Sequence, residues 1–245
     1  MNADCTMEEN VKMLMGDEKA DMVFFDPPYG MAYKSNGWDS KNQDVLENRT
    51  DKKIIGDEDF STAKKAIELI PKFFNEEGHL FVWCRWDSFE AFRNYLEEFS
   101  EVKGNIVWDK GDAPGMGDLA CSFGSNEMAV HSIIGRRKLN KRINSVWRQN
   151  RLKGLSMIHP TQKPIEVIEP AIIQTTDKGM TVIDFFLGSG STLIACEKTN
   201  RKCYGMEIDP HYIDVIVTRY SEFTKQKENI FLEREGKIIP YGDLI

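Results

Sequence analysis

Short apolar runs alternate with longer amphipathic segments along most of this chain. Runs of four to eight apolar residues are typical of buried strands, whereas apolar residues three and four apart are typical of helices. These patterns predict strands at 21–26, 79–85, 103–108, 127–134, 180–185 and 202–208. Helices are expected at 61–74, 87–99, 164–175, 191–200 and 210–225, with Ser61 capping the first and Pro164 in the first turn of the third.

Strands that are separated by helices indicate an α/β fold with a doubly wound, mainly parallel sheet. The 245 residues are enough for one domain, so we expect a single domain over 1–245. Two segments lack clean periodicity, a polar one at 30–57 and a basic one at 135–158. A loop as long as the first is usually functional, and we expect it to be a mobile loop beside the site.

The composition narrows the class of protein. Hydrophobic residues make up 41% of the chain, which is ordinary for a packed globular protein. No apolar run approaches the ~20 residues of a membrane helix, and the first residues are polar, so neither a membrane partner nor a signal peptide is expected. The five cysteines form no CxxC pair, which predicts reduced thiols in a cytoplasmic protein and no metal site.

Charge is distributed unevenly along the sequence. The net charge of −7 by itself disfavours nucleic acid, because phosphate binding depends on Lys and Arg. Between 128 and 165, however, there are nine Lys and Arg residues and no Asp or Glu. Such a run is often only a solvated face, but here it also suggests contact with phosphates.

Three motifs follow the ends of predicted elements. The first is Asp26-Pro27-Pro28-Tyr29, directly after a strand. The two prolines stiffen the turn and contribute no N–H, so their carbonyl groups are free acceptors beside a carboxylate. The motif suits a planar group that carries two N–H donors, although a plain proline-rich turn is the structural alternative.

The second motif is a glycine turn that follows the strand at 180–185. Glycines allow a ligand to approach the backbone, and the start of a helix supplies N–H groups. Leu193 occupies the third glycine position of the dinucleotide fingerprint, so that fingerprint is absent. Glu207 ends the next strand, where an acid suits a ribose diol. The turn consists of Asp184, Phe185, Phe186, Leu187, Gly188, Ser189, Gly190, Ser191 and Thr192.

The third motif is the sequence HPTQKP at 159–164, just before a predicted helix. Its Thr161 hydroxyl and Lys163 ammonium could hold a carboxylate. The structural alternative is a helix start, with Thr161 or Gln162 near the cap.

Taken in this order, DPPY, HPTQKP and FxGxG resemble the motifs of DNA amino-methyltransferases that use S-adenosyl-L-methionine, in the permuted group called the beta class. The resemblance covers nearly the whole chain, including Asp4-Cys5, the strand end at 107–110 and Asn126-Glu127. It implies a circularly permuted form of the seven-stranded methyltransferase sheet. Family members have a strand before the position of Asp4. Only three residues precede it here, so that strand is very short or the start of the chain is truncated or mis-assigned.

The resemblance also implies a role for each matching residue. Asp26 would face both the cofactor and the target amine, Tyr29 would stack on the target base, and Pro27 and Pro28 would complete the catalytic turn. Asp4 and the Cys5 backbone would contact the adenine of the cofactor, and Glu207 its ribose. Thr161 and Lys163 would hold its carboxylate. The rest of its pocket would be formed by Asp184, Phe186, Leu187, Gly188, Ser189, Gly190, Ser191 and Thr192.

Double-stranded DNA is the expected partner. Dimers occur in the family, so the resemblance also implies that a homodimer is possible. The side chains expected to contact DNA are Arg136, Arg137, Lys138, Lys141, Arg142, Arg148, Arg151 and Lys153. Trp147, Asn144, Gln149 and Asn150 lie among them and could reach bases.

Several alternatives remain at this stage. In the resemblance, an acidic first position of DPPY favours adenine and a serine favours cytosine, so adenine is predicted and methylation of the cytosine amine is the alternative. A catalytically silent DNA-binding homologue, a methyltransferase acting on RNA or on a protein glutamine, and a nicotinamide dehydrogenase are further alternatives. The dehydrogenase would leave DPPY without a role.

Overall fold

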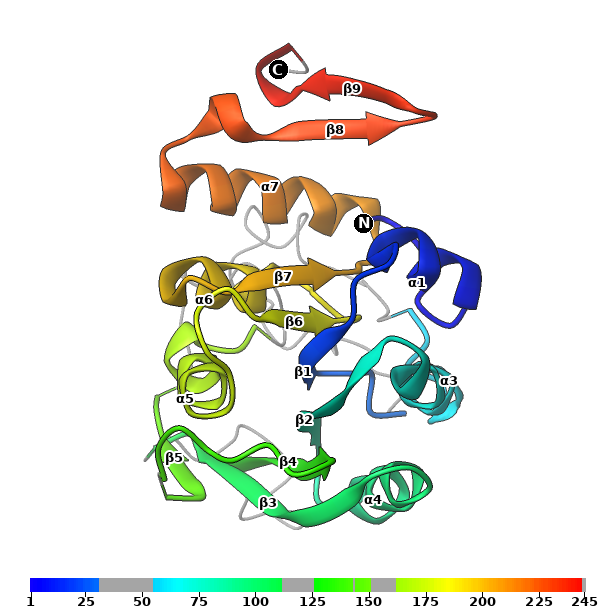
Figure 1. Cartoon of the computed structure of the whole chain (residues 1–245), viewed down its shortest axis with the longest axis vertical. Coiled ribbons are helices and arrows are strands. Elements are labelled where there is room, and N and C mark those ends of the chain that lie inside the picture. The colour runs from blue at the N-terminus through cyan, green and yellow to red at the C-terminus, as the bar shows by residue number, and fades with distance from the viewer. Residues whose placement is uncertain (31–54, 112–125, 143, 151–161, 244–245) are drawn as a thin grey trace, which may run out of the picture.

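The protein is built around a seven-stranded sheet with the strand order β5-β3-β4-β2-β1-β6-β7 (Figure 1). A computed structural model describes residues 1–30, 55–111, 126–142, 144–150 and 162–243. In the sheet only β4 is antiparallel to its neighbours, which confirms the predicted mainly parallel α/β fold. The strands are β1 (Ala20–Phe25), β2 (Phe74–Cys84), β3 (Glu101–Asp109), β4 (Asn126–Ile134), β5 (Val146–Arg148), β6 (Thr181–Asp184) and β7 (Lys202–Gly205).

Helices cover both faces of this sheet. Figure 1 shows α1, α3 and α4 on one side and α5 and α6 on the other, whereas α7 and a small hairpin lie beyond β7. The helices are α1 (Glu8–Met15), α3 (Ser61–Leu69), α4 (Phe89–Glu97), α5 (Ile165–Thr175), α6 (Ser191–Thr199) and α7 (Pro210–Thr224). The 3₁₀ turns are Ile70–Lys72, Lys227–Asn229 and Tyr241–Asp243, and the hairpin pairs β8 (Phe231–Arg234) with β9 (Lys237–Pro240).

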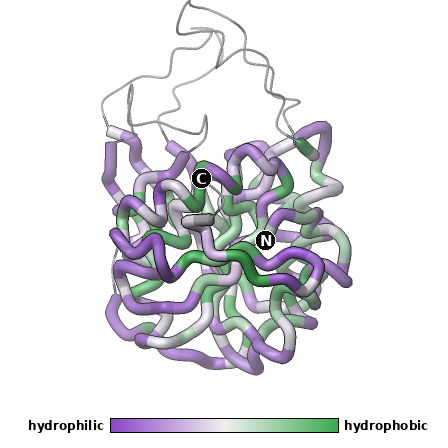
Figure 2. The backbone as a smooth tube through the Cα atoms, turned by 90° about the horizontal axis from the view of Figure 1, so that it is seen from above, coloured by the Kyte–Doolittle hydropathy of each residue, from purple (hydrophilic) through white to green (hydrophobic). Residues whose placement is uncertain are grey.

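The central strand β1 explains why both faces are covered. Successive side chains of a strand point to opposite faces. Met22 and Phe24 pack in the cluster with residues of α5 and α6, whereas Val23 and Phe25 pack in the cluster with residues of α1, α3 and α4. A strand that is apolar on both faces is stable only when both are covered. The hydrophobic segments accordingly gather in the interior of the chain trace in Figure 2.

Several elements differ from the predicted ones. The sequence pattern did not predict α1, β5 or the hairpin, and the predicted helix 61–74 gives way at Phe74 to the long strand β2. Ser61 does not cap α3, because its N–H donates to Asp59 Oδ1 at 2.8 Å and Phe60 precedes the helix. Pro164 lies just before α5 with extended backbone (φ −59°, ψ 143°) and is not in its first turn.

The first residues of the chain run beside the end of β7. Asn2 forms a parallel bridge with Glu207, and the Ala3 N–H donates to the Glu207 carbonyl at 3.2 Å. The terminal ammonium of Met1 donates to the Gly205 carbonyl at 2.7 Å. The residues before Asp4 are therefore joined to the segment that follows β7 by an isolated bridge.

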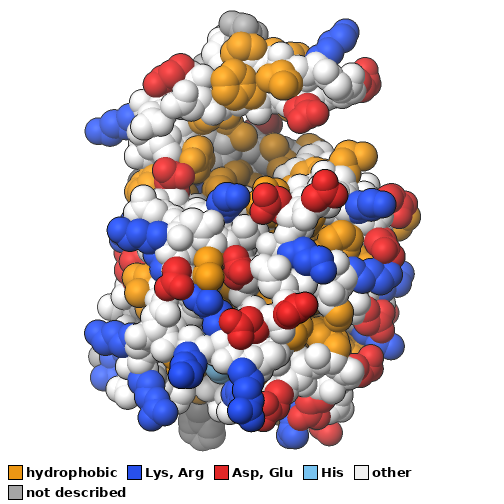
Figure 3. Space-filling model, in the orientation of Figure 1, with side chains coloured by type: hydrophobic (Ala, Val, Ile, Leu, Met, Phe, Trp, Pro, Cys, Tyr) orange, Lys and Arg blue, Asp and Glu red, His pale blue; other side chains and the backbone are white. Residues whose placement is uncertain are grey.

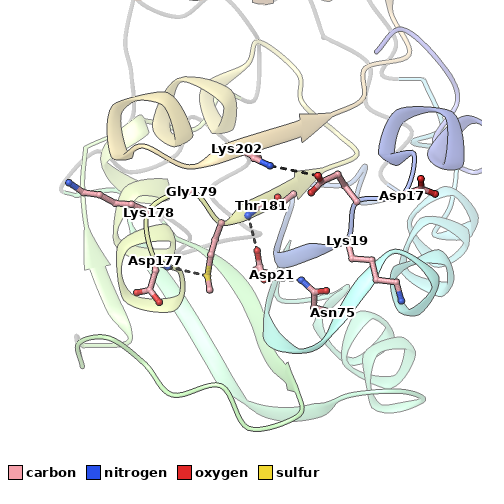
Figure 4. A pocket seen from close by; sticks show the side chains of 11 residues that line it. Asp17, Lys19, Asp21, Asn75, Asp177, Lys178, Gly179, Thr181 and Lys202 are labelled. Carbon is pink, nitrogen blue, oxygen red and sulfur yellow. Dashed lines mark hydrogen bonds and ion pairs between the residues drawn. The ribbon is translucent and has the colours of Figure 1, made fainter.

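The sheet has two edges with different properties. All its parallel strands end at one edge, where the antiparallel β4 begins at Asn126, and this edge is the expected ligand side. The opposite edge carries the polar depression of Figure 4. There Asp21 accepts hydrogen bonds from the Thr181 N–H at 2.8 Å and from Asn75 Nδ2 at 2.9 Å. These bonds tie β1, β6 and β2 together, so the depression has a structural explanation.

At Gly78, β2 lies so close to β1 that there is no room for a side chain. A Cβ atom at this position would overlap the Asp21 carbonyl oxygen and would stand 2.6 Å from Phe74 Cζ. We expect Gly78→Ala to lower the free energy of unfolding by about 1 to 3 kcal/mol in urea denaturation, because a backbone atom cannot move aside cheaply. Gly242→Ala is the control, since its Cβ would meet no atom within 4 Å. Equal stability of the two variants would contradict this prediction.

Candidate active site

Asp26 lies at the carboxyl end of β1, at the centre of the sheet. The strand is fixed by burial on both faces, and Pro27 is buried directly after it. The Tyr29 hydroxyl reaches back and donates to Asp26 Oδ1. The predicted catalytic turn is thus a compact unit in which the tyrosine hydroxyl orients the carboxylate.

A buried lysine forms the second contact to the same oxygen. Lys163 Nζ lies 2.5 Å from Asp26 Oδ1 and 3.0 Å from Glu127 Oε2, and it donates to the Tyr29 hydroxyl at 3.3 Å. The Lys163 side chain is only 3% exposed. Lys110 Nζ pairs in turn with Glu127 Oε1. Two carboxylates and two ammonium groups therefore alternate along one network, which we call the Asp26–Lys110 network (Asp26, Lys163, Glu127 and Lys110).

Burial and charge set the ionisation of this network. Burial raises the pKa of Asp26, and the Lys163 charge opposes that effect without cancelling it. Burial would lower the pKa of Lys163, but Asp26 and Glu127 outweigh it and raise this pKa. Burial likewise opposes ionisation of Glu127, yet Lys163 and Lys110 hold its pKa at about 2. Lys163 and Glu127 are therefore charged near neutral pH, and Asp26 is a carboxylate with an increased affinity for a proton.

The glycine turn follows the neighbouring strand β6. Val23 of β1 pairs with Ile183 of β6, so Asp26 and Phe186 stand at the same level, three residues further on. The Phe25 ring contacts the Phe186 ring edge-on, with centroids 5.6 Å apart. The two predicted motifs are therefore side by side at the same edge.

Positive φ angles and close packing shape this turn. Gly188 (φ 54°) and Gly190 (φ 82°) have left-handed backbone, which glycine adopts at little cost. The Arg219 guanidinium of α7 donates to the Ser189 carbonyl and, at 2.8 Å, to Ser189 Oγ. The Ser191 hydroxyl at the start of α6 is buried and has no hydrogen-bond partner among the described residues. A ligand with polar groups would satisfy it.

Glu207 lies beside the glycine turn, just beyond β7. Its carboxylate accepts from the Gly188 N–H at 2.8 Å and from the Asp209 N–H at 2.9 Å. Burial raises the pKa of Glu207, and the two N–H groups oppose this effect without cancelling it. Asp4 and Cys5 are brought to the same edge by the bridge between Asn2 and Glu207. The Cys5 side chain is buried in the core, so the contact between its backbone and the cofactor stays a prediction.

The structure divides the predicted basic segment between the two edges. Because β4 is antiparallel, the residues after Ile134 begin at the edge opposite Asp26. His79 Nε2 bonds the Arg137 carbonyl at 3.0 Å, and the Arg137 guanidinium binds the Thr175 carbonyl and Asp177. The predicted DNA contacts at this edge are Arg136, Arg137, Lys138, Lys141 and Arg142.

The second part of the segment returns to the edge of Asp26. β5 is parallel to β3 and ends at Arg148, whose side chain is 81% exposed and lies 2.8 Å from Asp109 Oδ2. Trp147 is buried against Phe81 and Trp83, and its indole N–H donates to the Asn144 carbonyl. The expectation that Trp147 could reach bases is therefore wrong, because the side chain fills the core.

Sequence reasoning gave no role to Glu127 and Lys110. Both were recognised only as ends of strands that resemble the family. The sequence does contain a signal for Glu127. It is the last acid before the acid-free stretch 128–165, and it is the first residue of a predicted strand. Thr161, Arg151, Lys153 and residues 31–54 of the expected loop lie outside the described residues.

Comparisons with known proteins identify the class. A family model described as DNA methylase matches residues 124–218. Type II methyltransferase M2.MboI of Moraxella bovis is 25% identical over 91% of this chain and 88% of its own. Type II methyltransferase M2.DpnII of Streptococcus pneumoniae is also 25% identical, over 82% of each chain.

Solved structures agree on the fold. The M1.HpyAVI–SAM complex has a TM-score of 0.65 at 22% identity and covers 89% of this chain and 97% of its own. A PvuII DNA methyltransferase described as cytosine-N4-specific has a TM-score of 0.62 at 15% identity, over 85% and 84% of the two chains. These two structures bear on the fold alone. The family match and the two methyltransferase relatives confirm the predicted resemblance to DNA amino-methyltransferases and the predicted enzyme class, a DNA methyltransferase.

No helix in the described ranges is long and apolar enough to cross a membrane. The same residues contain no group of three or more His, Cys, Asp or Glu side chains arranged for a metal ion.

Asp184 provides a test of the buried charges at this edge. Burial raises its pKa to about 7, and hydrogen bonds from the Thr192 side chain and from the Phe186 N–H, the latter at 3.0 Å, oppose that shift. The folded state therefore holds a proton that the unfolded state has lost, and stability declines as the pH rises from about 4 to 7. Asp184→Asn keeps an oxygen for the Phe186 N–H and removes the charge. We expect this variant to lack about 2 to 4 kcal/mol of that decline.

Urea denaturation at several pH values measures the effect. Asp214→Asn on the exposed side of α7 is the control and should follow the wild-type profile. A decline of the same size in Asp184→Asn and wild type would show that Asp184 is not its source.

Proposed function

We propose that the protein transfers a methyl group from S-adenosyl-L-methionine to the exocyclic amine of an adenine in double-stranded DNA. The observation that carries the proposal is the arrangement of Asp26 at the edge shared with the glycine turn. The donors that the described residues give to Asp26, from Lys163 and Tyr29, both go to Oδ1. In the proposed reaction, its Oδ2 accepts an N–H from the target amine.

An aromatic amine is a poor nucleophile because its lone pair is delocalised into the ring. Hydrogen bonds from its two N–H groups to Asp26 Oδ2 and to the Pro27 carbonyl favour a tetrahedral nitrogen with a free lone pair. The carboxylate also stabilises positive charge on that nitrogen. Asp26 is suited to take the excess proton, because burial raises its pKa toward the working range of a general base.

The residues of the neighbouring motif fit the cofactor. The Ser191 hydroxyl at this turn is buried and has no hydrogen-bond partner among the described residues, so it could bond to a polar group of a ligand. When bound, S-adenosyl-L-methionine supplies an electrophilic methyl group on a sulfonium. Asp4 and the Cys5 backbone would hold its adenine, and Glu207 its ribose. The methionine end would lie near Asp184, with the glycine turn from Phe186 to Thr192 as the floor.

The target must leave the duplex to reach Asp26, and Tyr29 offers an aromatic face for it. Adenine is proposed because the first position of DPPY is acidic. The fold does not decide between bases, since a cytosine-N4-specific enzyme shares it. Digestion of methylated DNA and identification of the modified nucleoside should yield N6-methyladenine, whereas N4-methylcytosine would support the alternative.

The order of the motifs and the short basic segment support proposals on the family group and on the oligomeric state. The motif order, with DPPY before FxGxG, is that of the permuted group. The stretch between β4 and HPTQKP is short for a recognition element, so a second copy of the chain would enlarge the DNA footprint. We also propose a cytoplasmic location, which the scattered cysteines favour.

Asp26→Asn tests the catalytic assignment. The amide lacks the negative charge and cannot take the proton, so we expect methyl transfer to fall by about 1,000-fold or more while cofactor binding persists. Radiolabelled methyl transfer and calorimetry measure the two effects. Asp17→Asn at the opposite edge is the control and should keep full activity. An active Asp26→Asn enzyme would refute the assignment.

Arg148 and Arg136 form a matched pair for the DNA interface. Both are exposed arginines of the predicted basic segment, but only Arg148 follows a strand that ends at the edge of Asp26. We expect Arg148→Gln to reduce the salt dependence of DNA binding by about one phosphate contact, and Arg136→Gln to leave it unchanged. Fluorescence anisotropy over a range of salt concentrations measures the slope. The reverse result would place DNA on the other edge.

A further inference from the structure

The contacts of Lys163 differ from those of a residue that holds the cofactor. An ammonium group has three N–H donors. In Lys163 they face three oxygens of the protein, namely Asp26 Oδ1, Glu127 Oε2 and the Tyr29 hydroxyl. A cofactor carboxylate could bind Lys163 only by displacing one of these partners.

The surroundings of Lys163 reinforce this arrangement. Its Nζ also lies 4.9 Å from the centre of the Trp83 ring, and Trp83 is fully buried. A cation so far from water is stable only with anionic partners. Asp26 and Glu127 supply them from two different strand ends, one after β1 and one in β4.

Glu127 is in turn held from its other side. Lys110 Nζ binds Glu127 Oε1 and lies 4.8 Å from the centre of the Trp108 ring. Lys110 follows β3, and Glu127 is level with Trp108 in the β3–β4 pairing. The pairing of two strands therefore fixes the carboxylate that fixes Lys163.

We propose that Lys163 and Glu127 are positioning residues for Asp26, with Lys163 orienting the catalytic carboxylate and Glu127 holding Lys163 against it. This inference rests on the proposed function, and it gives Lys163 a different role from the carboxylate clamp that the resemblance implies. Lys163 and the Tyr29 hydroxyl fix Oδ1, so that Oδ2 faces the target amine. Glu127 prevents Lys163 from turning away and, with Lys110, keeps the network close to neutral.

A positioning role and a carboxylate-clamp role of Lys163 predict changes in different quantities, kcat in the first case and the Kd for S-adenosylhomocysteine in the second. In a positioning role, Lys163→Met should lower kcat by about 100-fold or more, with the Kd for S-adenosylhomocysteine within about threefold of wild type. S-adenosylhomocysteine carries the same carboxylate as the cofactor, so loss of a clamp would instead raise its Kd about tenfold or more. Calorimetry and single-turnover kinetics at saturating cofactor separate the two. Lys178→Met, an exposed lysine at the opposite edge, is the control.

Substitution of Glu127 should also lower kcat, because Glu127 acts on Asp26 through Lys163. We expect Glu127→Gln to lower kcat by about tenfold or more, and Glu127→Asp to recover part of the loss, again with little change in the Kd for S-adenosylhomocysteine. The acid limb of the kcat profile should move to higher pH in Lys163→Met, because Asp26 then lies buried beside Glu127 without the cation between them. A structural role alone would leave that limb in place.

Stability gives a readout that does not depend on activity. In Lys163→Met two buried carboxylates face each other, so Tm should fall as the pH rises from 5 to 8, and Glu127→Gln in the same chain should reduce that fall. An active wild type whose Lys163→Met variant loses only cofactor affinity would overturn this inference alone. A wild type that neither binds S-adenosyl-L-methionine nor methylates DNA would overturn the proposed function as well.

Discussion

A carboxylate that is removed from water needs a cation, and this requirement shapes the centre of the molecule. Asp26 follows a strand whose side chains are nearly all buried, and Lys163 supplies the cation from a segment far along the chain. The same lysine needs Glu127, which needs Lys110. The ends of β1, β3 and β4 and the segment before α5 are thereby tied to one point. Loss of any member would leave the remaining buried charges out of balance.

The network also explains how a largely apolar sheet keeps a reactive group. β1 is covered on both faces, so its polar side chains lie toward its two ends, Asp21 at one and Asp26 just beyond the other. There the stiff turn of Pro27 and Pro28 turns the chain and brings the Tyr29 hydroxyl back to the carboxylate. On the adjacent strand, the glycine turn reaches the same level, and beside it the Ser191 hydroxyl is buried without a hydrogen-bond partner among the described residues. Geometry set by the sheet therefore places the proposed methyl acceptor and methyl donor side by side.

The charge distribution has a structural explanation in addition to a functional one. Part of the acid-free stretch is required for packing, because Arg137 binds the end of α5 and Trp147 fills the core. In Figure 3 acidic and basic side chains are mixed over the visible face of the body, whereas apolar side chains gather over the hairpin beyond α7. A run of like charges in sequence is thus divided in space by the direction of one antiparallel strand.

The sequence by itself determined the fold class, the order of the main elements and the three motifs. Those features depend on local pattern: apolar runs that must be buried, glycines that must adopt left-handed backbone, and prolines that stiffen a turn. The predicted cap at Ser61 and the predicted first-turn position of Pro164 differ from the structure, because a cap depends on side-chain geometry one residue away. Only the tertiary structure decided the partners of Lys163 and the position of Arg136 relative to Arg148. Ion pairs between distant segments and the edge at which a loop emerges depend on strand pairing, which no local pattern encodes.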